Sequence, residues 1–230
     1  MTVILACGGN QARWQHPVHS RKHLVPIFGE PLLHRTVRQL CDRDVFEIVI
    51  ISSDEILARP PATLISPVQP SLTMNIDKIL SSRHVWSHTE RTTLLFGDVV
   101  FSEKAMDAII NCEEPYIQWF GRAGPNSLTR HPYGEIFGLT FTIAASSLLR
   151  RAAKRLRKSL VLIRRLQSKR WQRIAPLRGN AWECYNRMHG MGWEDRTPTD
   201  DWTEINDMTD DFDYGHEYDT WIAHVLAVPQ

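Results

Sequence analysis

The feature that most restricts the fold of this chain is the alternation of short β-rich runs with helical patterns through its first half. The candidate strands are residues 3–6, 47–52, 62–65, 92–96, 116–120 and 135–141. The candidate helices between them are residues 31–41, 75–87 and 102–111. Strands that alternate with helices form a mostly parallel sheet with helices on both faces. We therefore predict an α/β fold, a three-layer α/β/α sandwich.

The second half of the chain is less regular. Residues 144–174 have one apolar helical face, and basic side chains fill the other; residues 150–173 hold eleven basic residues and no acidic one. Residues 179–201 are rich in Trp, Gly and Met without a clear period, and a final amphipathic helix is expected near residues 216–227. A chain of 230 residues, 43% of them hydrophobic, can fill a single core, so we predict one domain.

The cysteines and the apolar segments indicate the compartment. Cys7, Cys41, Cys112 and Cys184 are scattered and form no CxxC pair, which is typical of a reduced protein. The apolar run at residues 3–6 is too short for a signal peptide, and no segment reaches the roughly 18 apolar residues of a spanning helix. We expect a cytoplasmic protein with no membrane partner.

The first strand leads into a glycine turn that suits phosphate binding. The run Leu5, Ala6, Cys7, Gly8, Gly9, Asn10 lets backbone N–H groups approach phosphate oxygens, and Arg13 and Lys22 supply positive charge nearby. The segment matches neither the GxGxxG pattern nor the P-loop. Taken alone, it fits equally well a strand followed by an ordinary turn with solvated basic residues.

This segment resembles the opening signature of the GT-A-like nucleotidyltransferase family, LAAGxGxR followed after about ten residues by PKxLxPxxGxPLLxRT. The matching positions are residues 5–8, Arg13, residues 22–26, Gly29 and residues 31–36. The resemblance implies that the glycine loop wraps a nucleotide and that Arg13 and Lys22 grip its triphosphate. The chain departs from the signature at Arg21, which replaces a proline, and in a glycine loop that is one residue longer.

Two acidic positions fall where that family holds a divalent metal. Asp98 follows an apolar strand and Gly97, and a carboxylate at such an edge can hold Mg²⁺ against phosphate. The late run at residues 207–221 is similar to the family's DxDTPED tail; the resemblance places Asp213 as the second ligand, with Asp211 as the alternative. The cofactor expected from it is Mg²⁺, or Mn²⁺. An ordinary turn at Asp98 and a solvated acidic loop in the tail stay open as alternatives.

Weaker candidates complete the predicted site. Thr73 and Asn75 precede a helix where members of the family contact base and ribose, although a helix cap explains them equally well. Tyr133, Gly134 and Glu135 lie where such enzymes build the acceptor pocket. The resemblance divides the single domain into a nucleotide-binding half (residues 1–115), an acceptor-binding insertion with the basic helix (116–205) and a metal-binding tail (206–230).

The resemblance implies a nucleotidyltransferase that joins an NTP to a phosphorylated acceptor, most plausibly a sugar phosphate, and releases pyrophosphate. One alternative is a GT-A glycosyltransferase that uses a nucleotide sugar, but the mid-chain DxD typical of such enzymes is absent after Gly97. The other is a nucleic-acid-binding protein that uses the basic helix. The formal net charge of only +1 and the frequency of solvated basic helix faces make nucleic acid the less favoured partner.

Overall fold

The structure is a computed structural model that describes residues 1–8, 14–68, 74–126, 128–129, 131–165, 180–192 and 194–227. Arg13, Gly9, Asn10 and Thr73, which were predicted to contact the nucleotide, lie outside this set. None of the described helices has the length and apolar character needed to cross a bilayer.

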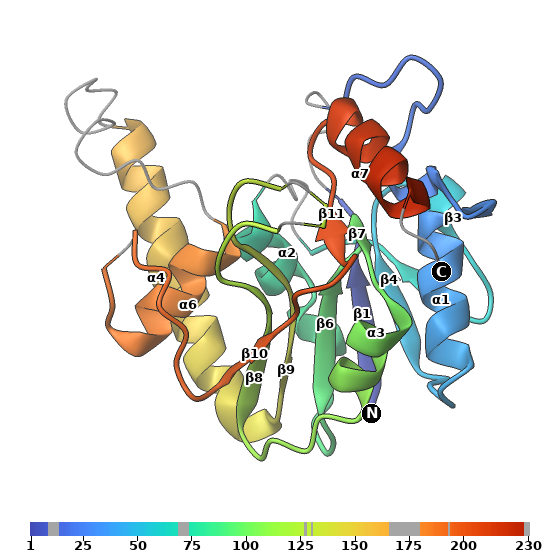
Figure 1. The fold of residues 1–230 in the computed structure, drawn as a ribbon. Coiled ribbons are helices and arrows are strands. Elements are labelled where there is room, and N and C mark those ends of the chain that lie inside the picture. The colour runs from blue at the N-terminus through green and yellow to red at the C-terminus, as the bar shows by residue number, and fades with distance from the viewer. Residues whose placement is uncertain are drawn as a thin grey trace.

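A seven-stranded sheet forms the centre of the molecule, in the order β10-β8-β9-β6-β1-β4-β5 (Figure 1). Its strands are β1 (Thr2–Ala6), β4 (Ile48–Ile51), β5 (Thr63–Ile65), β6 (Thr92–Phe96), β8 (Ile117–Arg122), β9 (Glu135–Phe141) and β10 (Trp202–Glu204). β9 runs antiparallel to both of its neighbours, and every other pairing in this sheet is parallel. The predicted mostly parallel sheet is confirmed.

The central strands are mostly apolar because both faces of the sheet are covered. Every residue of β1, β4 and β6 is buried, which is typical of parallel strands between two helical layers. The register pairs Leu5 with Ile50 on one side and with Leu95 on the other. The carboxyl ends of β1 and β6 therefore lie side by side, and the segments that follow them meet at one edge.

The helices form two groups. α1 (Leu32–Cys41) packs with α3 (Glu103–Ile110), and Arg43 bridges them through an ion pair of 2.7 Å with Asp107. α4 (Ile143–Arg165) packs with α2 (Asn75–Ser81) and α6 (Ala181–His189) (Figure 1). The two groups and the sheet make up the predicted three layers.

The C-terminal segment returns to the start of the chain. β11 (Asp210–Asp211) pairs antiparallel with β7 (Val99–Val100), and α7 (Gly215–Ala227) lies against the hairpin of β2 (Pro26–Ile27) and β3 (Glu30–Pro31) (Figure 1). The Tyr218 hydroxyl donates to the carbonyl of Pro26 at 2.8 Å. The ring centroids of Phe28 and Trp221 lie 5.9 Å apart. A separate apolar cluster, which includes Trp14, Val25, Phe212 and Trp221, holds the tail in this place.

One predicted helix differs from the structure, and one observed helix was not predicted. The helix expected over residues 75–87 ends at Ser81, and a short 3-10 helix (Arg83–Val85) follows. The hydroxyl of Ser82 stabilises this break because it donates to the Ile79 carbonyl and accepts from the Trp86 indole. The irregular stretch after residue 179 contains α6, which the sequence analysis missed. The basic helix continues to Arg165; the rest of its predicted length lies outside the described residues.

Candidate active site

A buried lysine and a buried aspartate form the centre of the site. Lys22 begins the 3-10 helix (Lys22–Leu24) ahead of the β2–β3 hairpin, and Asp98 comes two residues after the end of β6. The Lys22 ammonium donates to the Asp98 carboxylate, and only 8% of each side chain is exposed. Gly97 lets the segments that follow β1 and β6 pack closely, because a Cβ at this position would overlap the sulfur of Cys7. The ends of the two central strands thus position the ion pair.

Two further charges lie against this pair. The Nζ of Lys78, on α2, lies 3.5 Å from Oδ2 of Asp98 and 5.3 Å from the ring centroid of Phe96. Oδ1 of Asp213 lies 3.8 Å from the Nζ of Lys22. One ammonium therefore joins Asp98 to Asp213, which are 115 positions apart in the sequence. The structure brings together Lys22, Asp98 and Asp213 as the sequence predicts, and it adds Lys78.

The surroundings hold both members of the central pair in their charged forms. Burial alone would lower the pKa of Lys22, but Asp98, Asp213 and Asp211 outweigh it and raise that pKa. Burial alone would raise the pKa of Asp98, but Lys22 and Lys78 bring it well below its ordinary value. His23 is fully buried beside the pair; burial lowers its pKa to about 3, so its imidazole is neutral.

The other predicted nucleotide contacts lie around this pair. Leu5, Ala6 and Cys7 are buried in the main core, so only their backbone is available to a nucleotide. Burial raises the pKa of the Cys7 thiol to about 12, which leaves it protonated. Gly8 is half-buried at the strand end, and Asn75 is the half-buried first residue of α2, three positions before Lys78.

The tail carries a second carboxylate, Asp211, which has no ion pair with the described residues. In the β7–β11 ladder, Asp211 lies opposite Val99, and the N–H of Phe212 donates to the carbonyl of Asp98 at 3.3 Å. Burial, together with the carboxylates of Asp210, Asp213 and Asp98, raises the pKa of Asp211. Its Oδ1 is buried and has no hydrogen-bond partner within the described part of the chain. The charges of Asp211 and Asp213 both act on Lys22 and raise its pKa, so both residues remain candidate metal ligands.

Asp210, by contrast, is fully engaged. It accepts from the Arg122 guanidinium at 3.2 Å and from the Thr129 hydroxyl, and it contacts Nδ1 of His131 at 2.8 Å. Burial alone would lower the pKa of His131, but the hydrogen bond to Asp210 raises it. This network joins β8, the loop before β9 and β11, so it fixes the tail in place. No local sequence signal links these distant residues, and the sequence analysis missed them.

The predicted acceptor residues differ in what they can offer a ligand. The ring of Tyr133 is half-exposed, and burial raises the pKa of its hydroxyl to about 12. A Cβ on Gly134 would overlap the carbonyl oxygens of Arg122 and Ala123, which gives this glycine a packing role. Burial and the neighbouring Asp211 and Asp213 raise the pKa of Glu135 well above its ordinary value.

The residues present fit a divalent cation. Asp98, Asp211 and Asp213 offer carboxylate oxygens, the donors that Mg²⁺ and Mn²⁺ prefer, and the orphaned oxygen of Asp211 is a buried group that a cation would satisfy. His131, Asp210 and Asp211 also bring ligand atoms within 4.8 Å of one another. The engagement of Asp210 with Arg122 makes that second set the poorer one, because a guanidinium already balances the charge of Asp210.

The basic helix packs against α2, and one ion pair links the two helices. Nε of Arg157, on α4, lies 3.3 Å from Oδ1 of the buried Asp77. Asp77 precedes Lys78 on α2, so this pair ties the basic helix to the element that carries the second lysine. Arg150, Arg151 and Lys154 on the same helix are exposed.

Neither a protein-family model nor a curated protein matches the chain. Among solved structures, the chain is similar to a Bacillus anthracis protein assigned as a glucose-1-phosphate thymidylyltransferase, which was crystallised with sucrose. The two chains are 14% identical, the superposition has a TM-score of 0.57, and the match covers 100% of this chain and 96% of the other. The chain has a nucleotidyltransferase-type α/β fold. This likeness confirms the predicted fold class. The candidate site residues are supported only by the geometry described above.

Proposed function

We propose that the protein transfers a nucleotidyl group from an NTP to a phosphorylated acceptor and releases pyrophosphate. One observation carries the proposal: the buried Lys22 ammonium joins Asp98 to Asp213 at the carboxyl edge of the sheet, beside the segment that follows β1. A lysine with so little exposure, next to two carboxylates, is suited to exchange its ion pair for contacts to phosphate. The fold, which it shares with a protein assigned as a thymidylyltransferase, supports the same reading.

The reaction needs positioning and charge neutralisation rather than a general base. An oxygen of the acceptor phosphate, already ionised at neutral pH, forms a bond to the α-phosphorus of the NTP. The bond from that phosphorus to the α,β-bridging oxygen breaks, and its electron pair leaves with pyrophosphate. Negative charge on the leaving group grows during this step, and buried cations that are already in position stabilise it.

The described residues divide this work among themselves. Lys22 and Lys78, held together by Asp98, would contact the phosphate chain from two directions. Asp98, with Asp213 or Asp211, would hold Mg²⁺, which when bound supplies charge neutralisation to the phosphate oxygens. Asp98 thus has two tasks, since it orients both lysines and contributes a ligand.

The test is pyrophosphate release measured with each of ATP, CTP, GTP, UTP and dTTP in the presence of Mg²⁺ and a panel of phosphorylated acceptors. We expect release that depends on one acceptor and one base. The same panel with nucleotide sugars in place of NTPs tests the glycosyltransferase alternative, since it would release nucleoside diphosphate instead. Release of nucleoside diphosphate from a nucleotide sugar, with no pyrophosphate from any NTP, would contradict the proposal.

A further inference from the structure

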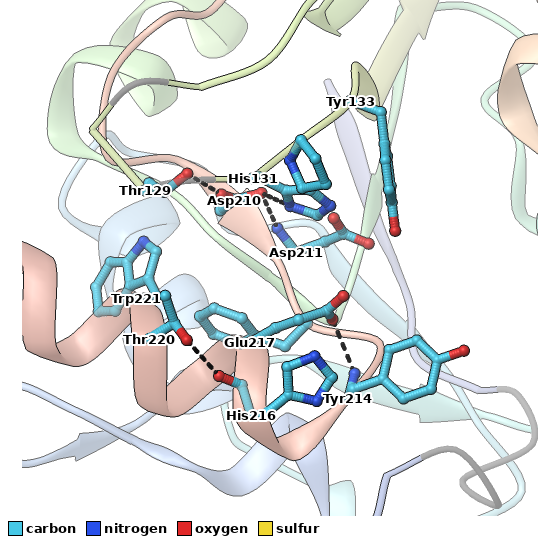
Figure 2. A pocket seen from close by; sticks show the side chains of 12 residues that line it. Thr129, His131, Tyr133, Asp210, Asp211, Tyr214, His216, Glu217, Thr220 and Trp221 are labelled. Carbon is cyan, nitrogen blue, oxygen red and sulfur yellow. Dashed lines mark hydrogen bonds and ion pairs between the residues drawn. The ribbon is translucent and has the colours of Figure 1, made fainter.

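We propose that the cavity beside the candidate active site binds a positively charged alkylammonium group, so that the acceptor is a phosphate ester with an ammonium head. This inference rests on the proposed nucleotidyl transfer and names the class of its acceptor. The cavity has a volume of about 310 Å³ and lies between the loop before β9, strand β11 and the first turns of α7 (Figure 2).

The cavity lies next to the reacting centre. Asp211 forms part of its wall, and the β7–β11 ladder places this residue opposite Val99, which directly follows Asp98. A phosphate held near Lys22 and Asp98 can therefore belong to a molecule whose other end enters the cavity. The acceptor phosphate and its head group would occupy adjoining places.

The charges on the cavity wall are negative. Asp210, Asp211 and Glu217 line it, and neither lysine nor arginine occurs among the described lining residues. Asp210 is balanced by Arg122 and His131. The Glu217 carboxylate, which is not among the candidate metal ligands, accepts the backbone N–H groups of Asp213 and Tyr214 at 2.7 and 2.8 Å, and the described residues provide it with no ion pair. A head group with negative charge would be repelled here, whereas a cation would balance these carboxylates.

Aromatic rings accompany these carboxylates. Tyr133 and Tyr214 are 51% and 38% exposed, and Phe212 and Trp221 form buried parts of the wall. Figure 2 shows the Glu217 and Asp211 carboxylates on neighbouring sides of the pocket, with Tyr133 and Tyr214 beside them. Alkylammonium groups bind to the faces of aromatic rings, and most strongly where carboxylates add to the negative potential. A neutral polyol could stack on the rings but would leave the charges unbalanced.

An independent observation indicates that the cavity receives a ligand. His131 lines the cavity with nine-tenths of its surface buried, and its Nε2 has no hydrogen-bond partner in the described part of the chain. Its Nδ1 is committed to Asp210. A buried polar atom without a partner is costly, and a ligand with its bound water in the cavity would satisfy it.

The test measures binding by calorimetry with two probes of the same shape, phosphocholine and 3,3-dimethylbutyl phosphate, which replaces the charged nitrogen by carbon. We expect phosphocholine to bind the full chain at least about tenfold more tightly. Glu217→Gln keeps an oxygen for the two backbone N–H groups and should lose most of this preference. The matched control is Asp219→Asn, which removes a charge from the exposed side of the same helix and should keep the preference.

A second pair of variants tests the site independently, in case Glu217→Gln does not fold. Tyr133→Leu should weaken phosphocholine binding, whereas Tyr133→Phe keeps the ring face and should bind like the wild type. Equal affinity for the two probes, or equal effects of Tyr133→Leu and Tyr133→Phe, would overturn the ammonium site. Pyrophosphate release with sugar phosphates but not with phosphocholine would overturn it while the nucleotidyl transfer stands. Selective binding without pyrophosphate release from any NTP would defeat the proposed function and keep the cavity assignment.

Discussion

Asp98 and Asp211 are neighbouring carboxylates in opposite electrostatic situations. Asp98, at the end of β6, has two lysine ammonium groups against it, whereas Asp211, on the facing strand β11, has carboxylates around it and an unpartnered oxygen. The fold therefore stabilises charge on the first and opposes it on the second. This difference fits our proposal, in which Lys22 and Asp98 are already paired before substrates arrive, whereas the tail would gain its counter-charge from a bound cation.

The strongest way to break this comparison is to neutralise each carboxylate in turn. Asp98→Asn removes the carboxylate that both buried lysines share and leaves Lys22 with Asp213 alone, so it should lower the free energy of unfolding by about 3–5 kcal/mol. Asp211→Asn removes a carboxylate from among others and should raise it by about 1 kcal/mol in metal-free buffer. Urea unfolding of both variants measures the two signs. Destabilisation of similar size in both would show that the two carboxylates are equivalent.

Addition of Mg²⁺ sharpens the same experiment. A cation that binds the native state raises the melting temperature, and we expect such a rise in the wild type. Either Asp98→Asn or the double variant Asp211→Asn/Asp213→Asn should reduce it. An undiminished rise in the double variant would place the cation away from the tail.

The next effect is on turnover. Lys22→Ala should lower pyrophosphate release by at least about a hundredfold, because a positioned cation contributes several kcal/mol to the transition state. Lys78→Ala should cost less, about tenfold, since Lys22 retains the direct hydrogen bond to Asp98. Steady-state kinetics separate the two lysines, with the exposed Arg38→Ala on α1 as the control of unchanged activity. Wild-type turnover in Lys22→Ala would contradict the proposed function.

A steric prediction concerns the approach of β1 and β6. Gly97→Ala forces its new methyl group onto the Cys7 sulfur, and we expect a loss of about 1–3 kcal/mol in stability. The double variant Gly97→Ala/Cys7→Ala removes the sulfur and should recover part of that loss. Thermal melts compare the single and double variants; no recovery would mean that the backbone, and not the sulfur, limits the approach.

The pH dependence of stability tests the sheet half separately. The pKa of His23 is about 3 in the folded protein, against 6.5 for an ordinary histidine. Below pH 6.5 the His23 imidazole of the unfolded chain therefore binds a proton, whereas that of the folded protein stays neutral down to about pH 3. His23 alone should lower the free energy of unfolding by up to about 1.4 kcal/mol for each pH unit in this range. In His23→Phe this part of the slope should vanish; an unchanged slope would show that other groups carry it.

The smallest effect is expected at the basic helix. Lys154 and Lys158 are exposed on α4, and the double change to Glu should alter pyrophosphate release with a small acceptor by less than about twofold, since exposed charges contribute little. Gel-shift measurements on DNA and RNA at several salt concentrations check the nucleic-acid alternative. Tight wild-type binding at physiological salt that this variant abolishes would favour that alternative.

The sequence predicts the central strands of the sheet well because buried strands are recognisable as short, mostly apolar runs. The buried strands β1, β4 and β6 are mostly apolar runs, and their boundaries agree within one residue at each end. α6 was missed because its buried residues 181–186 include the polar Glu183 and Asn186, so burial and polarity do not coincide along this helix. Residues typical of helix ends do flank it. At the N-cap the Asn180 side chain accepts a hydrogen bond from the N–H of Glu183, and at the C-cap Gly190 is in the left-handed region at φ 69°.

The candidate site divides in the same way. Lys22, Asp98 and Asp213 stand in motifs that the resemblance identifies, and the structure places them together. Lys78 is a lone cation among the apolar Ile76, Ile79 and Leu80, which is a weak signal for a buried charge. The Arg122–Asp210 pair joins residues 88 positions apart; Asp210 stands in the acidic tail, but no pattern marks Arg122 as its partner. Such pairings arise from the tertiary fold, which short-range patterns do not encode.

The docking of α7 on the β2–β3 hairpin has a consequence for the order of assembly. Tyr218 and Pro26 are 192 positions apart, and the same return of the chain carries Asp213 to Lys22. Contacts of such long sequence separation form late, because closing a long loop is entropically costly and slow. A ribosome must release almost the whole tail before these charges can meet. A growing chain can therefore build the central strands of its sheet early, whereas the contact between Lys22 and Asp213 must wait until the tail has been synthesised.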